Sequence, residues 1–220
     1  MPTILGVSGS PIPNSNTDRA VRFVLDETGL DSEFVKLSTQ RIEPCRACLA
    51  CVETNQCVIK DDGQALAHVF DQARAVVVGG FTPYSSLDAR TKAFMERMYC
   101  LRHKAGKSVG KVGAGVITTA CPPGAEGLPP ASDLASQQLG IWMMEEGVEN
   151  AGNLVIIGNV PCIRCGFGDT CEMSGIQMMG GPGATVESMG VSTFGEPPGG
   201  KDGEAAKDLA RRIRAAVDQA

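Results

Sequence analysis

The chain has 220 residues, of which 43% are hydrophobic, and a formal net charge of −5 at pH 7, which suits one globular domain with a substantial core. The acidic balance argues against a nucleic-acid partner. The sequence shows neither a signal peptide nor an apolar run near the ~20 residues of a membrane-spanning helix. We therefore expect a cytoplasmic protein that does not insert into a membrane, in which the nine cysteines stay reduced and their close spacings indicate metal sites rather than disulfides.

Short apolar runs alternate with amphipathic stretches along the chain. The run 75–80 contains three successive valines, which is typical of a strand buried on both faces. The stretch 16–28 has apolar residues at helical spacing, and Gly29 follows it where a helix often ends. In chain order, we predict strands over 3–8, 33–37, 75–80, 112–119 and 154–158, and helices over 16–28, 62–72, 88–101, 132–146 and 205–217.

Five strands that alternate with helices predict an α/β fold, in which helices cover a parallel sheet on both sides. Right-handed crossovers favour the doubly wound strand order 2-1-3-4-5. Two segments interrupt the alternation, a cysteine-rich one at 41–61 and an irregular Cys-, Gly- and Met-rich one at 159–200. We expect both to be insertions in a single domain spanning 1–220. An irregular segment as long as 159–200 usually serves a function.

A first cysteine set has the spacing C-x2-C-x2-C-x5-C and consists of Cys45, Cys48, Cys51 and Cys57. Thiolates are soft ligands that hold zinc and iron–sulfur clusters. Three cysteines at successive x2 spacings favour a [4Fe–4S] cluster, because one tight turn can direct three sulfurs to three corners of the same cube. Zinc more often takes two separated pairs, and it remains an alternative, as do unligated thiols and disulfides. The set indicates electron transfer.

A second cysteine set follows the fifth predicted strand, with Cys162, Cys165 and Cys171 at the spacing C-x2-C-x5-C. Cys121 follows the fourth strand, which is the expected neighbour of the fifth, so its thiol is a candidate fourth ligand. We predict that these four residues hold a second cluster or a structural zinc. Unligated thiols, or a redox-active pair formed by Cys162 and Cys165, are the alternatives.

The loop between the first strand and the first helix is rich in hydroxyl and amide groups. Such side chains and the free N–H groups of a helix N-terminus converge well on a phosphate monoester. The loop is neither a Walker loop nor a G-x-G-x-x-G dinucleotide fingerprint. An ordinary turn that caps a helix is the alternative. The candidate phosphate ligands are Ser8, Ser10, Ser15, Asn16 and Thr17.

Together these motifs resemble the iron-sulfur flavoproteins of the flavodoxin-like NADPH-dependent FMN reductase superfamily. The segment 8–17 resembles the FMN-phosphate loop of that group, and the first cysteine set is similar to its cluster box. The segment 82–86 is similar to the loop that wraps the isoalloxazine ring. The segment 119–127 stands where the family has a Gly-rich loop that touches the flavin, but it carries Cys121 and two prolines instead. For the ring, the resemblance implies Pro83, Tyr84, Ser85, Ser86 and Thr119.

The resemblance implies a flavodoxin-like fold with FMN and a [4Fe–4S] cluster as cofactors. A ferredoxin-like, low-potential donor would reduce the cluster, which would pass electrons to FMN and on to a small-molecule acceptor. It also implies a homodimer or homotetramer in which one subunit's cluster lies close to another subunit's flavin. No catalytic side chain is predicted, because the flavin carries the chemistry. Two alternatives are an NAD(P)H-dependent FMN or quinone reductase with structural zinc, and a non-enzymatic redox sensor.

Overall fold

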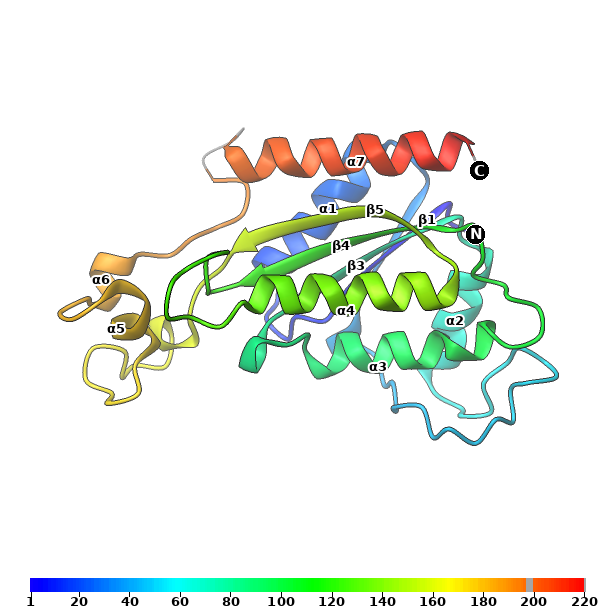
Figure 1. Cartoon of the computed structure of the whole chain (residues 1–220), viewed down its shortest axis with the longest axis horizontal. Helices are drawn as coiled ribbons and strands as arrows, with labels where there is room; N and C mark the ends of the chain where they lie inside the picture. The colour runs from blue at the N-terminus through cyan, green and yellow to red at the C-terminus, as the bar shows by residue number, and fades with distance from the viewer. Residues whose placement is uncertain (197–199, 220) are drawn as a thin grey trace.

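The computed structural model describes residues 1–196 and 200–219. Its five strands form one parallel sheet in the order β2-β1-β3-β4-β5, with helices on both faces (Figure 1). The predicted doubly wound sheet and its strand order are confirmed. The strands are β1 (Ile4–Ser8), β2 (Ser32–Lys36), β3 (Ala75–Phe81), β4 (Val112–Thr119) and β5 (Glu149–Ile157), and the long helices are α1 (Asn16–Thr28), α2 (Asp62–Gln72), α3 (Ala89–Met98), α4 (Ala131–Glu146) and α7 (Lys201–Gln219).

Alternation along the central strands divides the core into two layers. Val76 and Val78 of β3 pack with α2, α3 and α4, whereas Ala75 and Val77 pack with α1 and α7. Both faces of β3 are therefore apolar, which explains its uninterrupted run of valines.

Helix α1 has the bounds that the sequence predicts, because its two ends are capped. Ser15 and Asp18 form a capping box at the start, and Gly29 at the end takes the left-handed conformation with φ 63°. Strand β5 differs from the prediction, since it begins at Glu149 rather than at residue 154. Of the additional residues, Glu149, Asn150 and Asn153 are polar, and an edge strand tolerates them because one of its sides has no partner strand.

The two insertions lie at opposite ends of the sheet. In Figure 1 the strands point to the left, where the segment 159–200 extends, and the light-blue cysteine loop within 41–61 lies at the lower right, below α2 and α3. The segment 159–200 contains two short helices, α5 (Gly175–Gly180) and α6 (Val186–Met189), and its residues 197–199 lie outside the described part. Among the described residues, no helix is both long enough and apolar enough to cross a membrane.

Candidate functional site

A cavity of about 710 Å³ lies at the carboxyl edge of the sheet. The loops after β1, β3, β4 and β5 all contribute to its wall. This is the edge at which doubly wound sheets bind ligands, and the reversal of strand order between β1 and β3 marks the place. Two of the described lining residues are arginines and none is acidic, so the cavity suits an anionic ligand. Its wall comes from residues within 10–19, 81–84, 118–120, 158–164 and 191–193.

The phosphate loop brings the N-terminus of α1 to this cavity. The Asp18 N–H donates to Ser15 Oγ at 3.1 Å, and the Ser15 N–H donates back to the Asp18 carboxylate at 3.3 Å. The N–H groups of Asn16 and Thr17, the first residues of the helix, have no acceptor among the described residues. They lie at the positive end of the helix dipole, where an anion is stabilised.

The structure gathers most of the predicted cofactor residues around the cavity and leaves three outside its lining. The Ser8 side chain is fully buried and donates to Asp18 Oδ1 at 2.6 Å, so its hydroxyl serves the loop rather than the cavity. Ser86 bonds to Gln138 instead, with Gln138 Nε2 donating to Ser86 Oγ at 3.1 Å, and Ser85 also lies outside the lining. The predicted residues that line the cavity are Ser10, Ser15, Asn16, Thr17, Pro83, Tyr84 and Thr119.

Tyr84 stands at the rim of the cavity in an unusual backbone conformation. Its φ of 51° and the φ of 60° at Ser85 lie in the left-handed region, which costs a residue with a side chain roughly 1–2 kcal/mol. Strain of this kind clusters at ligand-binding loops. The Tyr84 side chain is fully exposed, which leaves its ring free to stack on a planar ligand.

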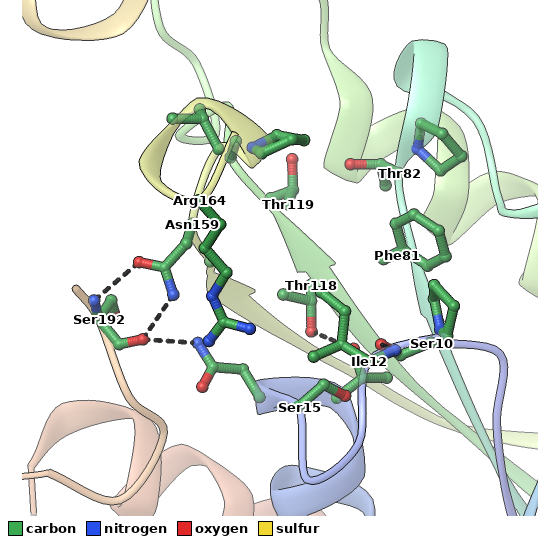
Figure 2. A pocket seen from close by; sticks show the side chains of 18 of the residues that line it. Ser10, Ile12, Ser15, Phe81, Thr82, Thr118, Thr119, Asn159, Arg164 and Ser192 are labelled. Atoms are coloured by element: carbon green, nitrogen blue, oxygen red, sulfur yellow. Dashed lines mark hydrogen bonds between the residues drawn. The ribbon is translucent and has the colours of Figure 1, made fainter. Parts of the chain in front are cut away.

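The segment 159–200 supplies a wall of the cavity that the sequence motifs did not reveal. The Ser192 carbonyl accepts from the side-chain amides of Asn16 at 3.1 Å and Asn159 at 2.7 Å. Figure 2 shows Asn159 directed at Ser192. Asn159 Oδ1 also accepts from the Ser192 N–H at 2.8 Å. The side-chain amide of Asn16, a predicted phosphate ligand, therefore closes the wall.

Arg164 reaches into the cavity from the same segment, toward the side of the phosphate loop (Figure 2). Within the described parts of the chain it forms no ion pair, whereas the other lining arginine, Arg19, lies 3.7 Å from Glu196. Arg164 is thus the lining cation that a ligand can engage without competition. Only the position of its segment directly after β5 could have suggested this role.

The first cysteine set surrounds a separate hollow of about 20 Å³. Arg97 on α3 ties both ends of this loop together, since its guanidinium donates to the carbonyls of Glu43 at 3.0 Å and Ile59 at 3.4 Å. It also forms an ion pair with Asp61 at 2.6 Å, and both side chains are fully buried. Burial alone would raise the pKa of Asp61, but the hydrogen bonds from Arg97 keep that pKa below its usual value. The cysteines that line the hollow are Cys45, Cys48, Cys51, Cys57 and Cys100.

The four predicted ligands of the first set all line this hollow, and as soft donors their thiolates suit an iron–sulfur cluster or zinc. Burial raises the pKa of Cys51, and it raises the pKa of Cys100 to about 11. Cys100 is therefore a neutral wall residue. Within 1–196 and 200–219, no three His, Cys, Asp or Glu side chains are already grouped as a metal ion requires. Ligation by either cysteine set stays a prediction.

The second cysteine set lies at the cavity end of the molecule. Pro161 precedes Cys162, Arg164 lies between Cys162 and Cys165, and both Pro161 and Arg164 line the cavity. Cys121 follows Thr119 at the same edge, and no hydrogen bond in the described parts of the chain joins it to the other three cysteines. Its role as a fourth ligand stays a prediction.

The sequence model of the NADPH-dependent FMN reductase family matches residues 2–148. The chain belongs to this family. Two curated relatives are iron-sulfur flavoproteins. That of Methanocaldococcus jannaschii is 32% identical over 120 residues, which cover 50% of this chain and 62% of the relative. That of Methanosarcina thermophila is 32% identical over 114 residues, covering 50% and 60%. The chain thus spans less than two thirds of the length of either relative.

Solved structures share the fold of this FMN reductase family member. RosB with bound 8-demethyl-8-formylriboflavin-5'-phosphate superposes with a TM-score of 0.67 at 9% identity, covering 98% of this chain and 79% of RosB. A WrbA-like flavodoxin from Agrobacterium tumefaciens superposes with a TM-score of 0.53 at 16% identity, covering 100% and 99%. The predicted flavodoxin-like fold is therefore confirmed.

Proposed function

We propose that this chain is an FMN-dependent oxidoreductase that passes electrons from a [4Fe–4S] cluster to FMN. One observation carries the proposal. The cavity joins an open helix N-terminus and two arginines to an apolar, aromatic rim, which matches a flat ring that bears a phosphate. Membership of the FMN reductase family and the names of the curated relatives support it.

The residues of the cavity fit FMN in size and in polarity. Its volume of about 710 Å³ lies within the range of cofactor sites. The N–H groups of Asn16 and Thr17 would bind the phosphate with Arg164, and Tyr84 and Thr119 would contact the ring. FMN supplies both one- and two-electron transfer when it is bound. The protein orients it and limits the access of water through the wall around Ser192.

The first cysteine set would hold the cluster through its four thiolates, in a loop that Arg97 fixes to α3. This loop and the cavity lie at opposite ends of the sheet, which supports transfer between two subunits (Figure 1). We therefore propose a homodimer or homotetramer in which each cluster serves a neighbouring flavin. A ferredoxin-like protein would be the donor and a small molecule the acceptor.

The description of the matching family favours one other function, direct reduction of FMN by NADPH. In that case the first cysteine set would hold zinc with a structural role. The two functions predict different metals and different electron donors.

Anaerobically purified protein decides between them. Iron, acid-labile sulfide, zinc and FMN are measured per chain, and flavin absorbance is followed after mixing with reduced ferredoxin or with NADPH. We expect about four irons and sulfides for each occupied cluster and bleaching by ferredoxin. Zinc without iron, together with bleaching by NADPH alone, would establish the second function instead. Protein that binds no FMN would contradict both functions.

A further inference from the structure

The second cysteine set repeats part of the first. Cys162, Cys165 and Cys171 have the spacing C-x2-C-x5-C, which is also the spacing of Cys48, Cys51 and Cys57. All nine cysteines of the chain are free thiols, and Cys165 is exposed while Cys162 and Cys171 are half-buried. These three thiols are therefore both unpaired and accessible.

The backbone folds these three residues into one compact turn. The Phe167 N–H donates to Cys165 Sγ at 3.4 Å, and the Phe167 carbonyl accepts from the Cys171 N–H at 2.9 Å. Phe167 thus joins two of the cysteines. The turn closes tightly against the third, since a Cβ placed on Gly168 would lie 2.5 Å from the carbonyl oxygen of Cys162.

Backbone donors are aimed at the sulfurs of this turn. The Gly175 N–H donates to Cys162 Sγ at 3.2 Å, in addition to the bond from Phe167 to Cys165. The first cysteine set shows the same feature, with the Ala47 N–H donating to Cys45 Sγ at 3.4 Å. Backbone N–H donors that point at ligand sulfurs are typical of sites in which cysteines hold a metal or an iron–sulfur cluster.

We infer that Cys162, Cys165 and Cys171 form a second thiolate site for a thiophilic metal, either an iron–sulfur cluster or zinc, beside the cavity. Cys121 is the candidate fourth ligand. It lies two residues after Thr119, whose carbonyl accepts from the Gly158 N–H at 2.7 Å, and Cys162 lies four residues after Gly158. The two chain segments therefore leave the sheet side by side.

Unlike the first cysteine set, the second site adjoins the cavity and can influence a residue that lines it. Arg164 lies between Cys162 and Cys165 and reaches into the cavity. A metal that fixes both cysteines would also fix the backbone of Arg164. In terms of the proposed FMN function, the second site would hold the cation that faces the FMN phosphate.

Two full-length variants test the inference. In the first, all four cysteines of the first set are replaced by serine, and in the second Cys162, Cys165 and Cys171 are replaced. Both are expressed with iron and zinc supplied and purified anaerobically, and iron, sulfide and zinc are measured per chain. Arg211→Met is the control, because Arg211 is an exposed side chain on α7 that lines neither the hollow of the first set nor the cavity. Circular dichroism checks that each variant is folded.

We expect the first variant to retain one metal centre per chain, with iron and sulfide identifying a cluster and zinc identifying a mononuclear site. The second variant should lack this metal centre and bind FMN more weakly than the wild type. A folded first variant free of iron and zinc would overturn the inference. Should that variant fail to fold, an unchanged metal content in the second variant would overturn it as well. Absence of FMN from the wild type would instead refute the proposed function and leave the metal result standing.

Discussion

Replacing Arg164 tests whether a single side chain selects the ligand of the cavity. Replacement by methionine keeps the length of the side chain and removes its charge. A charge-assisted hydrogen bond contributes about 1.5–3 kcal/mol, so the Kd for FMN should rise at least about tenfold. The Kd for riboflavin, which has no phosphate, should stay nearly the same. Fluorescence titration of the apoprotein measures both constants.

The control for this change is Arg211→Met, because Arg211 is an exposed arginine on α7 that pairs with Asp208 at 3.2 Å and does not line the cavity. Its affinity for both flavins should match the wild type. Equal losses of FMN and riboflavin affinity in Arg164→Met would contradict a role at the phosphate.

Glu146 gives the protein a stability that depends on pH. Burial raises the pKa of this carboxyl to about 7, an effect that Arg102 opposes and Glu145 adds to. One carboxyl oxygen of Glu146 is buried without a hydrogen-bond partner in the described structure. A folded-state pKa above the unfolded value means that the folded protein binds the proton more tightly. The stabilisation is thus complete at low pH and is lost as the pH rises from about 4.5 to about 7.

We therefore expect the free energy of unfolding of Glu146→Gln to exceed that of the wild type by about 1–3 kcal/mol at about pH 8. At about pH 4.5 the two free energies should be similar. Urea unfolding at the two pH values provides the measurement. Glu145→Gln is the control, since the side chain of Glu145 is 55% exposed. This substitution should change the free energy of unfolding little at either pH. If Glu146→Gln raised the free energy of unfolding equally at the two pH values, titration of Glu146 would be ruled out as the cause.

At the scale of elements, Arg97 makes the first cysteine loop part of the core. Replacement by methionine would leave Asp61 buried without a counter-charge, which costs about 3–5 kcal/mol of unfolding free energy. It would also release both ends of the loop from α3, so we expect the iron content to fall together with the stability. Urea unfolding and iron analysis on the same samples measure the two effects.

Lys104→Met is the matched control, because its ion pair with Glu53 of the same loop is exposed to solvent and does not line the hollow, so it should contribute little to stability. Adding Asp61→Asn to Arg97→Met should recover part of the stability, since it removes the unpaired charge. Wild-type iron content in Arg97→Met would show that the loop does not depend on this clamp.

The elements that the sequence predicted well are those whose signals are local. Helix α1 has its cap at Ser15 and its end at Gly29, and the valines of β3 mark a strand without reference to the rest of the chain. The start of β5 was missed because residues 149–153 contain no apolar run and depend on their pairing with β4. Ser8 was placed in the cavity because it belongs to the loop motif, but the direction of its side chain depends on Asp18.

The wall formed by 159–200 could not be predicted residue by residue, because the segment has no regular apolar period. Arg164 and Ser192 reach the cavity only after the chain has folded back over the edge of the sheet. The sequence located the cavity through the loops after the first, third and fourth strands, the first of which is the phosphate loop. The residues of its fourth wall are held in place by long-range hydrogen bonds such as those between Asn159 and Ser192.

At the scale of the whole molecule, the sheet separates the first cysteine set from the cavity. The cysteine loop packs against the C-terminal end of α3, while the cavity lies beyond the carboxyl ends of the strands (Figure 1). The rate of electron tunnelling falls steeply with distance. The proposed function therefore favours transfer between two copies of the chain, in which one copy brings its cysteine loop to the flavin of the other.

Mixed oligomers test this arrangement. One parent carries Cys45→Ser and Cys48→Ser and so keeps FMN without the first cluster, while the other carries Arg164→Glu, which places a carboxylate at the phosphate and so keeps the cluster without FMN. Neither parent alone should show flavin reduction by a ferredoxin. Co-expressed and purified with two affinity tags, the mixed oligomer should regain about half of the wild-type amplitude if cluster and flavin cooperate between subunits, because only one of the two possible pairs is intact. Transfer within a chain predicts no recovery, since no chain then carries both groups.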